Sequence, residues 1–124
     1  NTPLTLDGQG WSMKYNLLWD KVLGLGLMPE NFYQAELASY LPRINTYGLP
    51  LDSRADYTKS DWICWTARMT DDPAVRAALI EPVARELRET TSRVPFSDWY
   101  DTKTSRYEAF IARSVQGGIY ALML

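Results

Sequence analysis

The sequence predicts an all-α protein built from helical hairpins. Two observations carry this prediction. Apolar residues recur at spacings of three and four along several segments, which is the period of one face of a helix. Proline and glycine separate these segments, and no strand-rich region competes with them. We therefore expect two hairpins, over residues 11–41 and 59–90, followed by a fifth helix.

The first expected hairpin follows ten turn-rich residues that include a short extended stretch at Leu4–Leu6. A helix is predicted from about Trp11 to Leu25, where Gly24 and Gly26 end it. Its apolar stripe consists of Trp11, Tyr15, Leu18, Val22 and Leu25. A second helix is predicted over 29–41, because Pro42 cannot continue the hydrogen-bond pattern. The short connection favours an antiparallel pair.

The second expected hairpin joins a helix over 59–70 to one that begins at Asp72. Thr58 and Asp61 have the spacing of a capping box at the start of the first helix. Asp72 is a suitable N-cap because a proline follows it at the first helical position. This fourth helix extends towards residue 90, with an expected kink at Pro82.

The fifth helix is predicted to start at a second capping box, formed by Ser105 and Glu108, and to run towards Leu124. Gly117 and Gly118 lie inside it, and a helical glycine costs roughly 1 kcal/mol relative to alanine. We expect the close approach of a neighbouring backbone to compensate for that cost.

The composition excludes several classes of function. Hydrophobic residues make up 46% and charged residues 23% of the 124 residues, which is a globular composition. The net charge of −2 gives no nucleic-acid footprint, and no apolar run approaches the ~20 residues that span a membrane. The sequence has no histidine, which excludes a Ser-His-Asp triad and a histidine-bound metal within the chain. We expect no metal and no cofactor. Cys64, the single cysteine, is predicted to be a buried thiol.

Two long loops, 43–58 and 90–104, carry acidic residues beside aromatic ones. Short and long connections alternate, so both loops are expected at the same end of the helices. Asp61, Asp98 and Asp101 are the candidate catalytic residues, since two carboxyl groups can act as acid and base or activate a water. The candidate substrate-binding residues are Asp52, Arg54, Lys59, Trp99 and Tyr100.

Structural roles for these residues remain open alternatives. Asp61 is equally suited to capping a helix, and Asp98 and Asp101 to forming Asx turns in their loop. The helical aromatic residues are expected in the core; they are Trp11, Tyr15, Trp19, Trp62 and Trp65. Taken alone, the loops are also consistent with sugar binding without chemistry.

Four blocks of sequence resemble the glutaminase A family. They are WSMKYNLLWDKVLGLGLMP from Trp11 to Pro29, YGLPLDSRADYTKSDWICWTA from Tyr47 to Ala67, VPFSDWYDTKT from Val94 to Thr104, and ARSVQGG from Ala112 to Gly118. The blocks occur in the order and with the spacing found in that family. They cover nearly the whole chain from Trp11 onward.

The resemblance implies a fold. Residues 1–124 would be a single helical segment, the C-terminal portion of the six-helical-hairpin domain of a longer protein. This chain would therefore form only part of an (α/α)6 toroid, of the type found in six-hairpin glycosidases. The first residue, Asn1, is not a methionine, and we expect a processed product, a cut chain or a piece of something longer.

The resemblance also implies an activity, the hydrolysis of L-glutamine to L-glutamate and ammonia by a secreted, fungal-type hydrolase. Asp61, Asp98 or Asp101 would activate water or protonate the departing ammonia, and Arg54 or Lys59 would hold the substrate carboxylate. We expect the isolated chain to be inactive. The alternative is a carbohydrate-binding, lectin-like or other interaction module without catalysis, and a glycosidase is a weaker option that rests on fold analogy.

The expected partners are a small molecule, either glutamine or a sugar, and a second polypeptide. An open toroid would expose apolar faces that association would cover. We therefore expect a homo-oligomer, or a chain bound to the remainder of its parent protein, with no nucleic acid and no membrane as partner. The residues expected in the exposed patch are Leu17, Trp19, Ile119, Tyr120 and Leu122 to Leu124.

Overall fold

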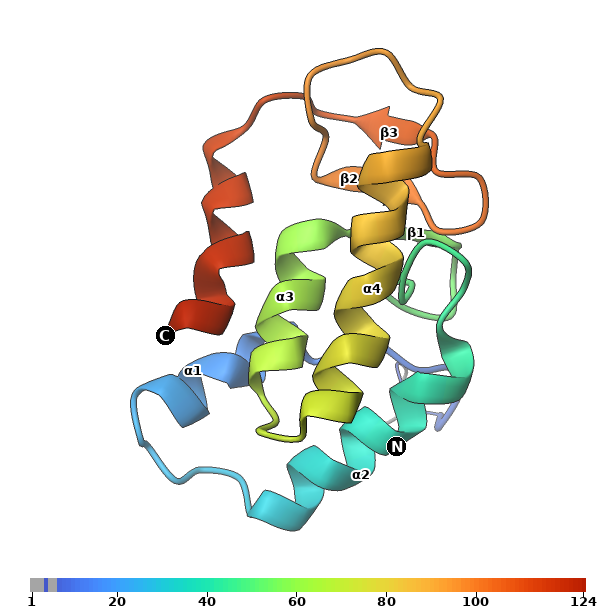
Figure 1. Ribbon diagram of the computed structural model, residues 1–124. Helices are drawn as coiled ribbons and strands as arrows, with labels where there is room; N and C mark the ends of the chain where they lie inside the picture. Colours follow the sequence, from blue (N-terminus) through green and yellow to red (C-terminus); the bar gives the residue numbers. More distant parts are fainter. Residues whose placement is uncertain (1–3, 5–6) are drawn as a thin grey trace.

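The computed structural model describes Leu4 and residues 7–124, so most of the extended stretch expected at Leu4–Leu6 lies outside the described residues. The helices are η1 (Tyr15–Leu17), α1 (Leu18–Val22), α2 (Glu30–Tyr40), η2 (Leu41–Arg43), α3 (Ser60–Arg68), α4 (Pro73–Glu89) and η3 (Ser114–Met123), where η marks a 3-10 helix. The strands are β1 (Tyr57–Lys59), β2 (Trp99–Asp101) and β3 (Tyr107–Ala109). In Figure 1, α3 lies between α4 and η3, with the strands at one end and α1 and α2 at the other.

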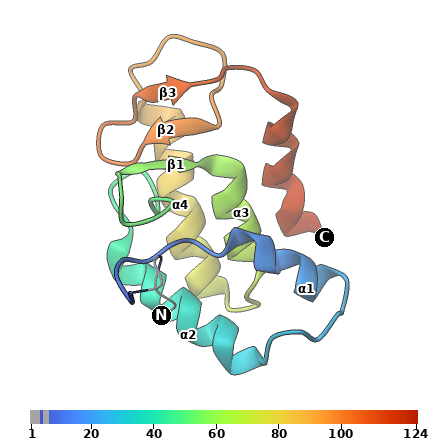
Figure 2. The same cartoon turned by 180° about the vertical axis from the view of Figure 1, so that it is seen from behind.

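The all-α prediction is wrong, because β1, β2 and β3 form an antiparallel sheet in that order. β1 pairs with β2 through Tyr57 and Asp101 at one end and Lys59 and Trp99 at the other. The sheet covers the end of the helices at which α3 begins and α4 ends (Figure 2). The chain is therefore a mixed helix-and-sheet unit, and the expected (α/α)6 array of purely helical hairpins does not describe it.

The sequence does not reveal the strands, because each is only three residues long. A periodicity of two needs about four to eight residues to be recognised. The sheet joins β1 to β2, about forty residues away along the chain, and β2 to its near neighbour β3. Two further backbone hydrogen bonds tie the same segments, from Ser60 N to the Asp98 carbonyl and from Tyr47 N to the Thr102 carbonyl, each at 2.9 Å. Both long loops thus meet at one end of the molecule.

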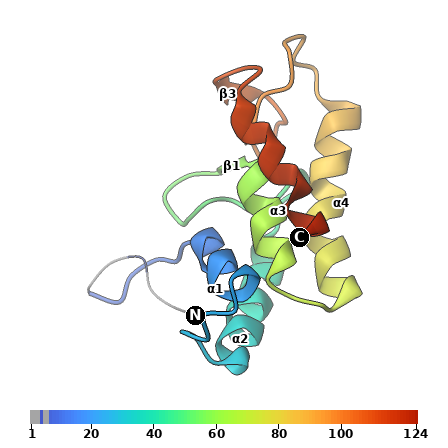
Figure 3. The same ribbon diagram turned by 90° about the vertical axis from the view of Figure 1, so that its left-hand side faces the viewer.

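The fifth helix begins nine residues later than predicted, and the second capping box does not form. Ser105 has φ 61°, a left-handed conformation that ends the turn between β2 and β3, and Glu108 lies within β3. The chain becomes helical at Ser114 as the 3-10 helix η3, which packs along α3 (Figure 3). At Gly118 an added Cβ would lie 2.8 Å from Trp65 Nε1, so the close neighbour is a side chain and not the expected backbone.

The first helix is also shorter than predicted, while the second is confirmed. Residues 11–14 are not helical, because their backbone bonds to the first long loop: Met13 N donates to the Leu51 carbonyl at 2.7 Å, and Ser53 N donates to the Trp11 carbonyl at 3.0 Å. Helical structure therefore starts only at Tyr15. α2 covers the predicted range, and the chain continues through Pro42 as the short 3-10 helix η2.

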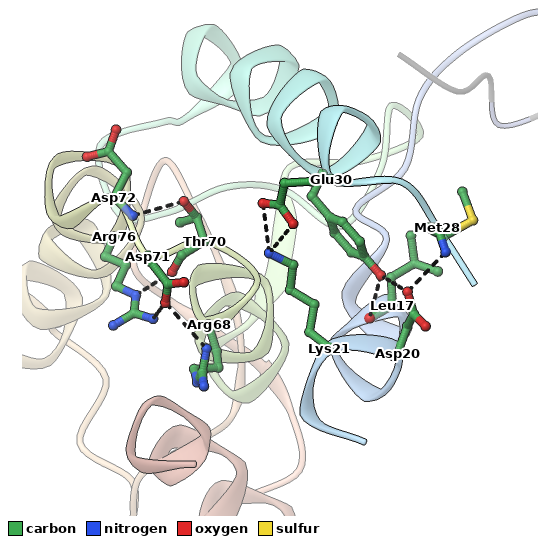
Figure 4. A network of polar contacts seen from close by, with 11 residues as sticks. Leu17, Asp20, Lys21, Met28, Glu30, Arg68, Thr70, Asp71, Asp72 and Arg76 are labelled. Atoms are coloured by element: carbon green, nitrogen blue, oxygen red, sulfur yellow. Dashed lines mark hydrogen bonds and ion pairs between the residues drawn. The ribbon is translucent and has the colours of Figure 1, made fainter. Parts of the chain in front are cut away.

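The carboxylate of Asp20 joins α1 to α2, because both of its oxygens accept hydrogen bonds. It accepts hydrogen bonds from Leu27 N at 2.8 Å, Met28 N at 3.1 Å and the Tyr33 hydroxyl at 2.5 Å. The neighbouring ion pair between Lys21 and Glu30, at 3.0 Å, also joins the two helices. Figure 4 shows Asp20 facing the backbone of Met28, with the Lys21 pair beside it.

The hairpin of α3 and α4 is confirmed, with one of its two predicted caps. Asp72 accepts a hydrogen bond from Ala74 N at 2.9 Å, as an N-cap should. α4 runs through Pro82 as one helix. At α3 the Thr58 and Asp61 pair is not a capping box, because Thr58 belongs to β1 and its hydroxyl oxygen has no hydrogen-bond partner in the described part of the chain.

The core lies between α2, α3 and α4. Its fully buried side chains include Leu18, Tyr40, Leu49, Ile63, Met69 and Leu79. Of the aromatic residues predicted there, Trp11, Tyr15, Trp62 and Trp65 are half-buried against the core, whereas Trp19 is 40% exposed. Within the described residues, no helix has the length and the apolar character that crossing a membrane would require.

Candidate functional site

The candidate site is centred on the junction where β1 passes directly into α3. Lys59 ends the strand and Ser60 begins the helix, so Asp61 lies in the first helical turn. Ser60 N donates to the carbonyl of Asp98 on the segment entering β2. Because this bond fixes the two loops against each other, the sheet that the sequence did not reveal is what brings Asp61 and Asp98 together.

Asp98 is bound by an arginine that sequence reasoning did not select. Its side chain is completely buried, and its carboxylate accepts hydrogen bonds from Arg113 Nε at 3.1 Å and Nη2 at 2.5 Å. A bidentate pair of this kind fixes both side chains. Arg113 precedes η3, so the pair also anchors that helix. Because both oxygens of Asp98 bind Arg113, this carboxylate is better suited to positioning neighbouring segments than to transferring a proton.

Asp61 is the buried carboxyl group of the site that lacks a full set of partners. It is 3% exposed, and its Oδ1 has no hydrogen-bond partner among the described residues. Burial, first, and the negative charge of Asp98, second, raise its pKa above the ordinary value, although backbone N–H groups and Lys59 act in the opposite direction. The protonated form is therefore favoured more than in an exposed aspartate.

Lys59 places a cation among aromatic rings beside this carboxyl group. Its Nζ lies 4.7 Å from the ring centroid of Trp62, 5.5 Å from that of Trp99 and 5.8 Å from that of Phe110. Such contacts stabilise an ammonium group without neutralising it. In the part of the chain that the structure describes, no carboxylate forms an ion pair with Lys59. Its charge is available to an anionic ligand.

η3 covers Asp61. An added Cβ at Gly118 would lie 2.9 Å from the Cβ of Asp61 and 2.8 Å from Trp65 Nε1, so only glycine permits this approach. The contact explains why Asp61 is buried although it lies near a helix start. A substrate would reach the carboxyl group only after η3 has shifted.

Asp52 and Arg54 lie at two open cavities, of about 430 and 490 Å³, and line both of them. The Asp52 carboxylate accepts from Arg54 N, Nε and Nη2 at 2.9, 3.0 and 2.6 Å, and these bonds lower the pKa of Asp52. The larger cavity extends to Trp62, which also contacts Lys59. Trp62 therefore belongs both to the wall of the larger cavity and to the surroundings of Lys59.

Asp101 and Tyr100 are occupied with structural contacts. Asp101 accepts from Lys103 N and Thr104 N, both at 2.8 Å, and so forms the turn between β2 and β3. Tyr100 is completely buried, and its hydroxyl donates to the Tyr47 carbonyl at 2.7 Å. The structure does not bring these two side chains to the Asp61 cluster, and only the backbone of β2 links them to it.

Trp99 has an aromatic neighbour on its ring and a buried indole nitrogen. Phe110 stacks on it with centroids 5.4 Å apart at 27°, and Nε1 has no hydrogen-bond partner among the described residues. Phe110 and Arg113 are the site residues that sequence reasoning missed. Arg113 lies within the quoted ARSVQGG block, which was a usable signal, whereas nothing in the sequence singled out Phe110.

The cluster combines a buried carboxyl group, a fixed ion pair and an aromatic-supported cation. A carboxyl group with a raised pKa can donate a proton to a leaving group, and the cation can bind a carboxylate. Over Leu4 and residues 7–124, the acidic and cysteine side chains form no group of three that could hold a metal ion.

Comparisons with known proteins agree on one family. The model of the glutaminase A six helical-hairpin domain matches residues 5–123. Glutaminase A of Aspergillus oryzae is 41% identical over 113 residues, which cover 89% of this chain and 16% of that protein. A probable glutaminase of Arthroderma benhamiae is 36% identical over 101 residues, covering 79% of this chain and 12% of that protein.

The chain thus spans less than a fifth of the length of either relative. No solved structure matches it. A family model that matches almost every residue, together with the two glutaminase relatives, shows that this chain belongs to the glutaminase A family.

Proposed function

We propose that the chain supplies part of the active site of an enzyme that hydrolyses L-glutamine. Water attacks the carbon of the side-chain amide, the C–N bond breaks, and the nitrogen leaves as ammonia after accepting a proton. The products are L-glutamate and ammonia. Family membership supports this reaction, because both relatives carry the name glutaminase.

The observation that carries the proposal is the state of Asp61. A departing amide nitrogen needs a proton, and a carboxyl group supplies it best when its pKa approaches the working pH. Asp61 is buried beside Asp98, its pKa is raised, and its Oδ1 is not committed to a hydrogen bond in the described structure. We assign it the role of general acid. In the reverse direction of proton transfer, its carboxylate accepts a proton from water.

Charged neighbours complete the proposed site. Lys59, and Arg54 at the rim of the cavity, are positioned to bind the α-carboxylate of glutamine. Asp98 and Arg113 act as positioning residues, because their bidentate ion pair fixes the segment against which Asp61 lies. The aromatic side chains around Lys59 limit the access of water, which strengthens these electrostatic contacts.

The rest of the active site is proposed to come from another part of the protein. The chain corresponds to 16% of the Aspergillus oryzae glutaminase A, and Asp61 is covered where the chain stands alone. Catalysis needs the reacting groups to be held within hydrogen-bond reach by a rigid surround. We therefore expect no appreciable turnover by these 124 residues alone. Sugar binding is less well supported, because Phe110 already stacks on Trp99.

A segment exchange tests the proposal. The chain replaces the matching segment of the Aspergillus oryzae glutaminase A, and ammonia release is measured with L-glutamine, D-glutamine and L-asparagine. We expect turnover of L-glutamine by the chimera and none by the isolated chain. A folded chimera that binds glutamine but releases no ammonia would contradict the proposed role. Robust turnover by the isolated chain would contradict the need for a larger protein.

A further inference from the structure

A further cavity lies beside the last turn of α4, at the same end of the molecule as the Asp61 cluster. It has a volume of about 200 Å³ and is bounded by the last turn of α4, the segment 90–97 and β3. Figure 1 shows this segment looping from the end of α4 back to β2. None of the candidate site residues lines this cavity, although Ser97 in its wall directly precedes Asp98.

Glu86 places a carboxyl group in the wall of this cavity. It is only 5% exposed, and its Oε2 is buried with no hydrogen-bond partner in the described chain. No lysine or arginine pairs with it over the residues that the structure describes. Burial raises the pKa of Glu86 to about 7. An unpaired buried carboxyl group is unfavourable unless a partner neutralises it.

The other polar groups of the wall are already engaged. Thr90 Oγ1 donates to the Ser105 carbonyl at 2.7 Å and accepts from Ser92 N at 3.2 Å. Ser92 Oγ accepts from Tyr107 N at 3.1 Å. Ser97 Oγ lies 2.7 to 2.9 Å from three carbonyl oxygens. Of the side chains in this wall, Glu86 is the one with a buried polar atom that lacks a hydrogen-bond partner among the described residues.

The remaining wall is apolar and aromatic, formed by Leu87, Val94, Phe96 and Tyr107. The phenol of Tyr100 on β2 interacts with Glu86, and Tyr107 on β3 lines the same cavity. Neither phenol is a cation, and Arg93 on the segment 90–97 is exposed and forms no ion pair with Glu86 in the described structure. A ligand that fits both parts of the wall carries a positive charge on a short apolar body.

We propose that this cavity binds a small primary alkylammonium ion, whose charged end pairs with Glu86 and whose aliphatic chain lies against Val94 and Phe96. An ammonium group donates charge-assisted hydrogen bonds to a carboxylate. The volume limits the ligand to roughly six non-hydrogen atoms at about 30 Å³ each.

The test uses n-butylammonium as probe and n-butanol as its neutral counterpart. Binding to the 124-residue chain is followed by isothermal titration calorimetry and by amide chemical shifts of Phe96 and Tyr107. We expect n-butylammonium to bind the wild type, and Glu86→Gln to weaken this binding at least tenfold. The matched control is Glu81→Gln, an exposed residue of the same helix paired with Arg88.

The pH dependence gives a second readout. The ionised form of Glu86 grows as pH rises through about 7. Affinity for n-butylammonium should therefore increase about tenfold between pH 6 and pH 8, as the ionised fraction does. Binding of n-butanol should not change over this range.

A third variant keeps the inference testable if Glu86→Gln alters the fold. Val94→Phe fills the cavity and leaves the carboxyl group in place, and it should abolish binding of n-butylammonium. Equal affinity in the wild type and Glu86→Gln, or shifts confined to residues outside this cavity, would overturn the proposal. So would an affinity for n-butanol equal to that for n-butylammonium at pH 8.

Discussion

Asp20 and Asp61 are buried to a similar degree, 7% and 3% exposed, but their surroundings shift their pKa values in opposite directions. Asp20 accepts a hydrogen bond from the Tyr33 hydroxyl, which is the largest cause of its lowered pKa, and others from backbone N–H groups. Asp61 has an unpartnered Oδ1 and a negative neighbour, Asp98, and its pKa is raised.

The difference teaches that burial alone does not mark a functional carboxyl group. A buried carboxylate with enough donors remains ionised and joins two elements, as Asp20 joins α1 to α2. A buried carboxyl group without those donors retains its proton more readily and is free to exchange it. Glu86 resembles Asp61 in this respect, although burial is the cause of its raised pKa and no neighbouring charge contributes.

The largest expected effect is on catalysis. In the chimera with the Aspergillus oryzae glutaminase A, Asp61→Asn should lower kcat for L-glutamine by about 10²- to 10⁴-fold, the usual contribution of a general acid. Asp20→Asn should leave kcat within about threefold of the wild type, since Asp20 is a structural residue. Steady-state ammonia release measures both. Equal losses in the two variants would remove the functional distinction between these carboxyl groups.

The second largest expected effect is the pH dependence of the free energy of unfolding that Glu86 causes. Its pKa of about 7 in the folded protein exceeds the unfolded value of 4.5, so the folded state binds more protons between these values. Stability should therefore fall as pH rises from 4.5 to 7, by up to about 3 kcal/mol.

Glu86→Gln should flatten this part of the pH profile, because a neutral amide has no ionised form in the cavity. Urea unfolding at a series of pH values measures the change, and the exposed Glu81→Gln serves as control. A profile that is the same in the wild type and Glu86→Gln would show that burial does not raise the pKa of Glu86.

A smaller effect should follow from crowding η3 against Asp61. Gly118→Ala places a methyl group 2.8 Å from Trp65 Nε1 and 2.9 Å from Asp61 Cβ, which should destabilise the fold by about 2 kcal/mol. Displacing η3 should also admit water and return the pKa of Asp61 towards its ordinary value. Chemical denaturation and a carbon-13 titration of the Asp61 carboxyl group measure the two effects.

Gly117→Ala is the matched control, because an added Cβ there meets nothing within 4 Å. It should be neutral or stabilising by up to about 1 kcal/mol, since alanine favours a helix more than glycine does. If both alanine variants behave alike, the contact of η3 with Asp61 is not what buries that side chain.

The smallest expected effect is the loss of one acceptor at Asp20. Asp20→Asn replaces a carboxylate oxygen by a donor, so one N–H group of Leu27 or Met28 loses its partner and Tm should fall by roughly 5 °C.

The stability that Asp20 contributes should depend on pH in the opposite direction to the stability that Glu86 contributes. The pKa of Asp20 is lowered, so its contribution to stability is present above the ordinary value of 3.8 and disappears as pH falls through the folded value. Differential scanning calorimetry over a series of pH values should therefore show a difference between wild type and Asp20→Asn that shrinks as pH falls below 3.8. A difference that persists in acid would mean that the hydrogen bonds of Asp20 do not depend on its charge.

Part of the site was predictable because it consists of neighbours in sequence. Lys59 and Asp61 lie at a helix start that apolar periodicity and Thr58 located to within a residue or two, although Thr58 is no cap. Asp98 was selected with them as an acid in the second long loop. Arg113 was not selected, because an arginine fifteen residues from its partner has no spacing that reveals the pair.

The sequence by itself determined the helices with strong local signals, namely α2, α3 and α4, and it determined the family through its blocks of sequence. Only the tertiary structure decided that residues 57–59, 99–101 and 107–109 are strands, since three-residue segments carry no readable period and β1 pairs with a partner about forty residues away.

The tertiary structure also decided the charge states. Asp20 and Asp61 look alike in sequence, each in the first turn of a helix. They differ because the turn after α1 returns its N–H groups to Asp20, whereas the sheet and η3 bring Asp98 and Gly118 against Asp61. The pKa of a buried carboxyl group depends on the donors and charges that the fold places around it, and chain neighbours alone do not fix these.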